Sequence, residues 1–143
     1  MAGATLLLAF SALVVGVHDG DTVKVRTDAG ELRSIRLASI DAPELGQSWG
    51  RASGDSLRRL CLGKRAVIRP ETVDKYRRLV ARVQCGRVDA NRHQVERGLA
   101  WVYVKYAAPD SPLLPLQAQA QYYRRGLWMA GYTTPPWHWR HPK

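Results

Sequence analysis

Hydrophobic and polar residues alternate through most of the first third of the chain. Such alternation is typical of β-strands with one face buried. Turn sequences rich in Asp and Gly separate the alternating segments, so we predict that they form a three-stranded meander. The predicted strands are Val14–Val17, Thr22–Thr27 and Glu31–Leu37.

In the rest of the chain, segments whose hydrophobic residues have helical spacing alternate with short segments typical of strands. We expect no regular structure from Trp128 onward, because that tail is rich in Pro and Trp. This order of elements predicts an α+β protein built on a small barrel. The predicted elements are a helix over Ser48–Leu62, strands over Ala66–Arg69 and Leu79–Gln84, a short helix capped by Asp89 and ending at Gly98, an extended segment Leu99–Tyr106, and a helix over Leu113–Leu127.

Composition narrows the class of protein. The 143 residues amount to about one domain, and 45% hydrophobic with 24% charged residues argues against disorder or a coiled coil. Lys and Arg exceed Asp and Glu by 22 to 12, a net charge of +10. This surplus favours a polyanionic partner, nucleic acid first and an anionic membrane second. The alternative is a basic surface that serves only solubility.

The N-terminal apolar run, Thr5–Val17, is too short to span a bilayer, so we expect no stable membrane insertion. Its first part resembles the apolar core of a secretory signal, with Ala9–Ser11 as the cleavage site, although no Lys or Arg precedes it. We therefore expect residues 1–11 to be a signal remnant and the protein to be secreted or periplasmic. The alternatives are a first strand continuous with Val14 and a cytoplasmic protein.

The two cysteines, Cys61 and Cys85, match no zinc-binding spacing. In an exported protein they would form one disulfide, and otherwise they would be small buried hydrophobic residues. The sequence leaves both interpretations open.

Acidic residues gather in two loops of this basic protein. Asp19 and Asp21 flank a glycine at the junction of two predicted strands, and Asp41 and Glu44 follow the next strand. Carboxylates and backbone carbonyls at loop ends are the ligands that Ca²⁺ or Mg²⁺ requires. Arg36 lies between the loops, on the strand face opposite Ile35 and Leu37. Carboxylates for a metal, one for a water and arginines for a phosphate suit phosphodiester cleavage.

Three sequence runs resemble the signatures of the staphylococcal (thermonuclease-type) nuclease family, in the same order and with similar spacing. The resemblance covers about Ala12 to Trp128. It implies a five-stranded OB-type barrel with about three helices, and calcium-dependent endonucleolytic cleavage of DNA and RNA that leaves a 3′-phosphate and a 5′-hydroxyl. The runs are Val17-His18-Asp19-Gly20-Asp21-Thr22-Val23, Ile35–Glu44 and Asp74-Lys75-Tyr76-Arg77-Arg78.

The resemblance also assigns roles residue by residue. Asp21, Asp41 and the backbone carbonyl of Ala42 would hold the cation, Ca²⁺ or, as the less favoured alternative, Mg²⁺. Glu44 would activate the water, and Arg36 and Arg78 would contact the scissile phosphate as catalytic residues. Asp19 would support the metal site from behind.

The residues that would contact the substrate match the family pattern less well than the metal and phosphate residues do. We place Lys75, Tyr76 and Tyr106 at the substrate, but the expected aromatic partner of Tyr106 is replaced by Val104, unless Tyr103 takes its place. Arg77 stands where the family usually has a glycine. We expect a monomer that acts on DNA, RNA or both.

The chain divides into residues 1–11, a nuclease-like domain over 12–128 and a tail over 129–143, which we expect to pack on the barrel rather than stack on nucleic acid. A non-catalytic OB-fold nucleic-acid-binding module is the alternative function. Against it, the predicted strands up to Gln84 lack an aromatic stripe for base stacking. The acids Asp21, Asp41 and Glu44, which such a module would not need, are all present.

Overall fold

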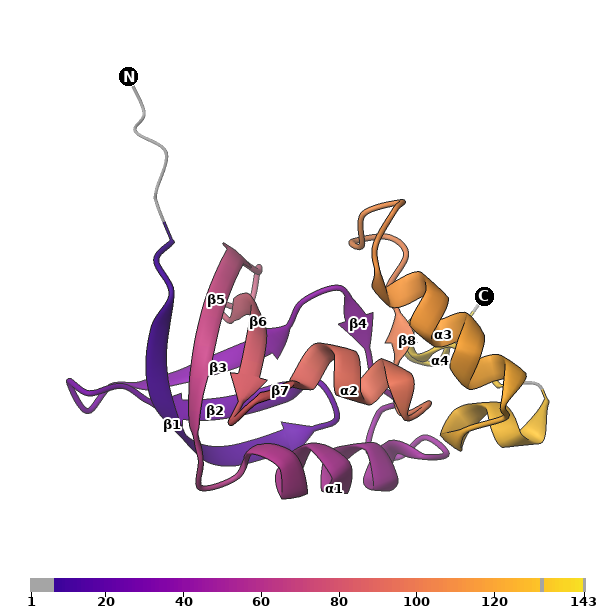
Figure 1. The fold of residues 1–143 in the computed structure, drawn as a ribbon, viewed down its shortest axis with the longest axis horizontal. Coiled ribbons are helices and arrows are strands. Elements are labelled where there is room, and N and C mark those ends of the chain that lie inside the picture. Colours follow the sequence, from indigo (N-terminus) through magenta and orange to yellow (C-terminus); the bar gives the residue numbers. More distant parts are fainter. Residues whose placement is uncertain (1–6, 132, 143) are drawn as a thin grey trace.

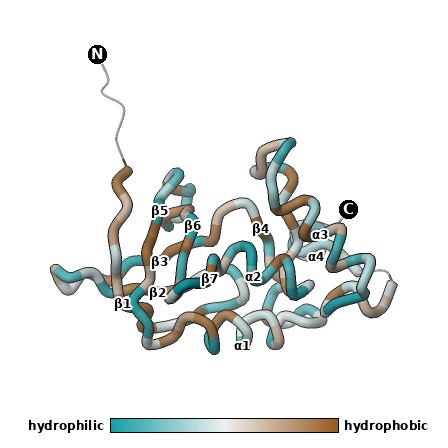
Figure 2. Tube along the Cα trace, viewed as in Figure 1, coloured by the Kyte–Doolittle hydropathy of each residue, from teal (hydrophilic) through white to brown (hydrophobic). Residues whose placement is uncertain are grey.

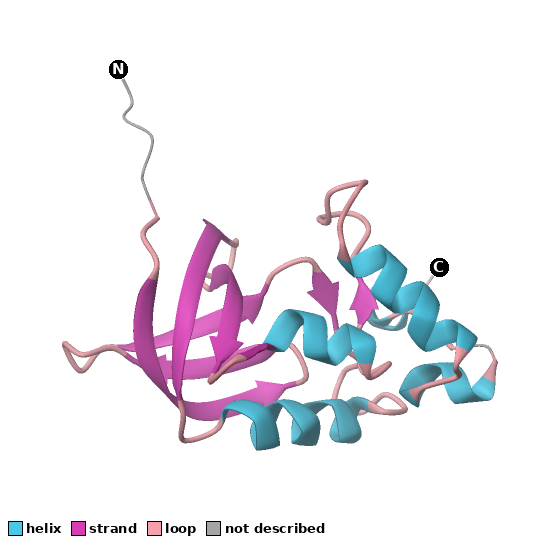
Figure 3. Ribbon diagram, in the orientation of Figure 1, coloured by secondary structure: helices cyan, strands magenta, loops and turns pink. Residues whose placement is uncertain are grey.

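Five strands form a closed barrel because the third and the last of them pair with each other. The computed structural model describes residues 7–131 and 133–142, and all statements below concern these residues. The strand order is β3-β2-β1-β5-β6, and a parallel pairing of β3 with β6 closes the ring. Figures 1 and 3 show the barrel on one side of the molecule and α3 and α4 on the other. The barrel strands are β1 (Phe10–Asp19), β2 (Thr22–Arg26), β3 (Leu32–Leu37), β5 (Arg65–Val73) and β6 (Leu79–Cys85).

The alternation seen in the sequence places one face of each barrel strand in the core. Val14 on β1, Val23 on β2 and Ile35 on β3 are each at most 1% exposed, and burying such a side chain contributes about 1.5–3 kcal/mol. Two irregularities in the β1–β2 pairing bend β1 so that the sheet can curl. The hydropathy of the trace follows this pattern, with hydrophobic colour on the strands and hydrophilic colour at the β2–β3 turn (Figure 2).

The helices cover the barrel and extend it at one end. Asp89 caps α2, as the sequence predicts, by accepting a hydrogen bond from the Arg92 backbone N–H. α1 runs along β1 at the lower side of the barrel in Figure 1, and a disulfide joins Cys61 at its end to Cys85 at the end of β6. The helices are α1 (Gly50–Cys61), α2 (Ala90–Glu96), α3 (Leu113–Tyr122), the 3₁₀ helix η1 (Gly126–Ala130) and α4 (Pro136–Arg140).

Several sequence predictions need correction. The segment Leu99–Tyr106 is extended only at β8 (Trp101–Val102), which pairs with a short strand that the sequence pattern missed, β4 (Ile40–Asp41). A further short strand, β7 (Val88–Asp89), pairs antiparallel with β6. The predicted helix Leu113–Leu127 ends at Tyr122. The tail is not irregular, because η1 and α4 form there.

At the N-terminal end β1 begins at Phe10 and continues through Val14–Val17. Phe10 pairs with Ile68 of β5 and packs against the core. Most of the predicted signal remnant, residues 1–6, lies outside the described residues, so its role stays a prediction. No described helix combines the length and the apolar character that a bilayer crossing demands.

Candidate active site

The turn between β1 and β2 holds its two carboxylates against the barrel. A Cβ at Gly20 would overlap the side chains of Ser53 and Ala42, so only glycine lets this turn approach α1 so closely. Gln94 of α2, fully buried, donates a hydrogen bond to the Gly20 carbonyl at 2.9 Å. Asp19 accepts a hydrogen bond from the Asp21 backbone N–H at 3.1 Å, which fixes the turn.

The second acidic loop meets the first one directly. Asp41 lies on β4 opposite Trp101 of β8, and its side chain is fully buried. The next residue, Ala42, donates its backbone N–H to Asp21 Oδ2 at 2.8 Å. Asp21 Oδ1 accepts a further hydrogen bond from the Thr22 hydroxyl at 2.9 Å. The structure therefore brings Asp21 and Asp41, about twenty residues apart in sequence, to one place.

Arg36 connects these two carboxylates. It extends from β3, beside β2, with a side chain only 13% exposed. Its Nη1 lies 3.3 Å from Asp21 Oδ2 and its Nη2 lies 3.1 Å from Asp41 Oδ1. Asp21, Arg36 and Asp41 thus form a compact buried cluster, as the sequence motifs predict.

Burial, neighbouring charges and hydrogen bonds shift the pKa values of Asp19, Asp21 and Asp41 in different directions. Burial, and then the neighbouring charge of Asp21, raises the pKa of Asp19 to about 8. Burial alone would also raise the pKa of Asp21, but the Arg36 guanidinium and several hydrogen bonds hold it below its usual value. Burial raises the pKa of Asp41 despite its hydrogen bonds from Arg140.

The donor set suits a hard cation that keeps part of its water shell. The described residues contain no group of three or more His, Cys, Asp or Glu side chains arranged to hold a metal ion. Two carboxylates, Asp21 and Asp41, and the neighbouring backbone carbonyl of Ala42 remain as oxygen ligands. Sites of one or two carboxylates completed by water and substrate phosphate are usual for Mg²⁺, and Ca²⁺ likewise takes carboxylate oxygens, backbone carbonyls and waters as ligands. The residues present therefore fit the cation that the sequence motifs imply.

Glu44 joins the cluster through a residue that the sequence interpretation missed. Arg140, the last residue of α4, donates from Nη1 to Glu44 Oε1 at 2.6 Å and to Asp41 Oδ1 at 3.0 Å. Its Nη2 donates to Asp41 Oδ2 at 2.7 Å. Burial disfavours its charge, but these two carboxylates hold the pKa of Arg140 above its usual value. The basic end of the Pro/Trp-rich tail was the only sequence signal for this contact.

Arg78 is not part of the cluster in this structure. Its Nε donates to Asp74 Oδ2 at 2.8 Å, and Asp74 also accepts hydrogen bonds from the backbone N–H groups of Tyr76 and Arg78. The pairing of β3 with β6 nevertheless brings the start of β6 beside β3, one residue from Arg36. Arg77 has a φ of 65°, which explains why a glycine would suit this position.

The predicted substrate residues lie at the surface. Tyr76 is 67% exposed, with Lys75 Nζ 5.2 Å from its ring centroid. Tyr106 is 66% exposed and packs edge-on against Tyr103 at 4.9 Å. Tyr103 in turn stacks on Trp137 of α4, with ring centroids 5.1 Å apart and planes 11° apart. The tail therefore packs beside β8, and the structure leaves Tyr106 the more accessible of the two tyrosines.

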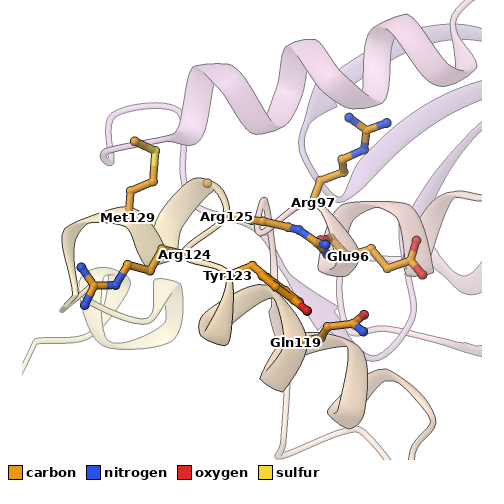
Figure 4. A pocket seen from close by; sticks show the side chains of 8 residues that line it. Glu96, Arg97, Gln119, Tyr123, Arg124, Arg125 and Met129 are labelled. Atoms are coloured by element: carbon orange, nitrogen blue, oxygen red, sulfur yellow. The ribbon is translucent and has the colours of Figure 1, made fainter.

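A separate pocket lies away from this cluster. It measures about 730 Å³ and is built from the ends of α2 and α3 and from η1. Figure 4 shows Tyr123 beside Arg125, whose guanidinium carbon lies 5.1 Å from the centre of that ring. None of the predicted site residues lines this pocket, so the cluster of buried acids and arginines, which the sequence motifs single out, is kept as the candidate active site.

Comparisons of the sequence identify a family and several related proteins. The sequence model of the "Staphylococcal nuclease homologue" family matches residues 34–130. A protein of Escherichia coli O157:H7 named "Uncharacterized endonuclease" is 41% identical over 132 residues, which cover 91% of this chain and 84% of that protein. The "Micrococcal nuclease" of Shigella flexneri is 33% identical over 141 residues, covering 92% and 80%. An "Uncharacterized endonuclease" of Haemophilus influenzae is 35% identical over 127 residues, covering 89% and 71%.

Proposed function

The chain belongs to the staphylococcal nuclease family and is a nuclease, and we propose that it cleaves DNA, RNA or both as a calcium-dependent endonuclease centred on Asp21, Arg36, Asp41 and Glu44. One observation carries this proposal. Arg36 lies within 3.3 Å of both Asp21 and Asp41, and these are three of the residues that the family motifs assign to the cation and the phosphate. Glu44 joins them through Arg140.

Asp21, Asp41 and the carbonyl of Ala42 would hold the calcium ion. When bound, the ion would withdraw electron density from a nonbridging phosphate oxygen and so favour attack at phosphorus. Hydrogen bonds from Thr22 and from the Ala42 backbone keep the Asp21 carboxylate oriented before the ion arrives. Magnesium is the less favoured alternative, because the resemblance to the family motifs favours calcium.

Glu44 would accept a proton from the attacking water. Its Oε1 faces Arg140, and among the described residues Oε2 receives no hydrogen bond, so it is available to a water. The Glu44 side chain is 30% exposed, whereas Asp41 beside it is fully buried. Of the two, Glu44 is therefore the one that solvent water can reach.

Arg36 and Arg78 would stabilise the charge that builds on the phosphate oxygens. Charged donors aimed at developing charge often contribute ~3 kcal/mol each. Arg36 is in place at the cluster, and Arg78 would have to exchange its hydrogen bond with Asp74 for one with the phosphate. Lys75, Tyr76 and Tyr106 would contact the rest of the substrate from the surface.

We propose that the protein works as a monomer and is secreted or periplasmic. The disulfide between Cys61 and Cys85 supports this location, because structural disulfides persist mainly in oxidising compartments.

The proposed reaction is tested by digesting a plasmid and an RNA transcript with calcium, with magnesium and with excess chelator. We expect cleavage with calcium, loss of cleavage with chelator and recovery when calcium is added back. Asp21→Asn should abolish the calcium response, whereas Asp110→Asn, which changes an exposed acid, should not. Cleavage that persists unchanged in chelator would remove the cation from the reaction.

A further inference from the structure

The C-terminal tail reaches across the molecule and touches the candidate active site at several points. Trp137 holds the middle of the tail in place, because it stacks on Tyr103 and packs edge-on against Trp101 at 5.4 Å. Trp101 is the β8 residue paired with Asp41 of β4. The tail is therefore anchored on the strand next to the one that carries the buried carboxylate, and α4 brings Arg140 to that carboxylate.

The same tail also braces the loop that carries Glu44. Gln47 accepts a hydrogen bond from the Glu44 backbone N–H at 3.2 Å and donates one to the Thr134 carbonyl at 2.8 Å. A Cβ at Gly46 would lie 3.6 Å from the ring of Trp139, an ordinary packing distance. Hydrogen bonds and packing from the tail thus hold the segment from Glu44 to Gln47.

Arg140 connects the two functional carboxylates with one rigid group. Its planar guanidinium binds Asp41 through two nitrogens and Glu44 through one of them. A planar fork fixes direction as well as distance, which a lysine ammonium cannot do. Arg140 therefore sets the position of the partly exposed Glu44 relative to the fully buried Asp41.

The contacts of Arg140 leave acceptor positions available on both carboxylates. A carboxylate offers about four lone-pair positions. Asp41 uses two on Oδ1, for Arg36 and Arg140, and one on Oδ2, for Arg140. One position on Asp41 Oδ2 remains for a cation, and Oε2 of Glu44 remains for a water. By this count Arg140 orients the carboxylates without excluding the groups they are proposed to bind.

We propose that Arg140 is a positioning residue of the nuclease, which acts through Glu44 and is delivered by the C-terminal tail. This inference rests on the proposed roles of Glu44 and Asp41. Misplacement of a reacting group by about 1 Å can cost about 100-fold in rate. Arg140→Ala should therefore lower kcat by roughly 10- to 100-fold and change KM much less, because substrate contacts lie elsewhere.

The test compares Arg140→Ala, Arg140→Lys and Arg87→Ala on a fluorescent oligonucleotide at saturating calcium. Arg87 is exposed in the turn between β6 and β7 and controls for the loss of one positive charge. Thermal unfolding of each variant shows whether it is folded. We expect Arg140→Lys to recover part of kcat and Arg87→Ala to behave as wild type. Wild-type kcat in folded Arg140→Ala would overturn the proposal.

A second arm repeats Arg140→Ala in a Glu44→Gln background. If Arg140 acts through Glu44, its removal should cost almost nothing further there, because the group it positions is already lost. A full additional loss of kcat would overturn the proposal. Wild-type activity of Glu44→Gln alone would instead contradict the role proposed for Glu44. Impaired Glu44→Gln together with normal Arg140→Ala would reject only the role of Arg140.

Calcium titration without substrate separates positioning from blocking. If the tail instead competed with the cation, Arg140→Ala would bind calcium far more tightly and would exceed wild-type turnover at subsaturating calcium. Positioning predicts calcium affinity within a few-fold of wild type and lower turnover at every calcium concentration. Turnover above wild type at low calcium would therefore overturn the proposal.

Discussion

Replacing Arg36 with alanine would remove the guanidinium that lies between two buried carboxylates. The Arg36 side chain is 13% exposed, and those of Asp21 and Asp41 are 6% and 0% exposed. Water therefore cannot solvate these acids once the guanidinium is gone. We expect Arg36→Ala to be less stable than wild type, most clearly when no divalent cation is present.

The structure sets the size of this effect. Removing one partner of a buried ion pair costs about 3–5 kcal/mol. Asp41 would keep its two hydrogen bonds from Arg140, so Asp21 suffers the larger loss and the lower value, about 3 kcal/mol, applies. For a chain of this length that corresponds to a melting temperature lower by about 10 °C. Calcium should restore part of this difference, because Asp21 and Asp41 without the neighbouring charge of Arg36 should bind the cation more tightly, and tighter binding to the folded state stabilises it more.

Thermal and urea unfolding, each with chelator and with calcium, measure these differences. Arg33→Ala is the matched control, because Arg33 lies on the same strand but is 37% exposed and pairs only with the exposed Glu31, at 3.6 Å. Arg33→Ala should lower the free energy of unfolding by less than about 1 kcal/mol. The reasoning is refuted if Arg36→Ala unfolds in chelator as wild type does, or if calcium stabilises both proteins equally.

Three further predictions concern other parts of the molecule. Arg36→Lys and Arg78→Lys should each lower kcat by roughly 100-fold, and the double variant by less than the product; near-normal initial rates for either lysine variant would remove that arginine from the site. Reducing the Cys61–Cys85 disulfide, which spans 24 residues, should lower the free energy of unfolding by about 3 kcal/mol; an unchanged urea midpoint with reductant would contradict this. Burial raises the pKa of Asp74, but hydrogen bonds from Arg78 outweigh burial and hold that pKa below 3.8. Asp74 therefore stabilises the fold above that pH, and this stabilisation is lost as the pH falls through the folded pKa. Urea unfolding from about pH 3 to about pH 7 should show that the stability advantage of wild type over Asp74→Asn shrinks only at the acidic end.

The barrel strands and the acidic loops could be predicted because their signals are local. Alternation places Val23 and Ile35 in the core wherever the strand lies, since successive side chains of a strand face opposite sides. Asp89 caps its helix through the next few residues alone. The element boundaries were predicted less well. β1 extends to Phe10 because Phe10 pairs with Ile68 of β5, and α3 stops at Tyr122, shortly before Arg124 takes a left-handed conformation.

Much of the candidate site could also be read from spacing. Asp21 lies between the barrel strands β1 and β2, Arg36 lies on the barrel strand β3, and Asp41 lies on β4 just after it, so the fold itself brings them together. Arg78 shows the limit of this reasoning. Its position beside β3 follows from the motif, but its side chain pairs with Asp74, four residues away, because the turn between β5 and β6 offers a nearer carboxylate.

The sequence by itself determined the five barrel strands, the cap of α2, the two acidic loops and the arginine between them, because each of these depends on residues close together in the chain. Tertiary structure alone decided that Cys61 meets Cys85 and that Arg140 reaches Asp41, 99 residues away. No periodic pattern of hydrophobic residues predicts contacts between residues so far apart in the chain. Arg140 reaches its place because Trp137 stacks on Tyr103 and a buried carboxylate attracts a guanidinium. Both interactions exist only once the barrel has folded and β8 has paired with β4.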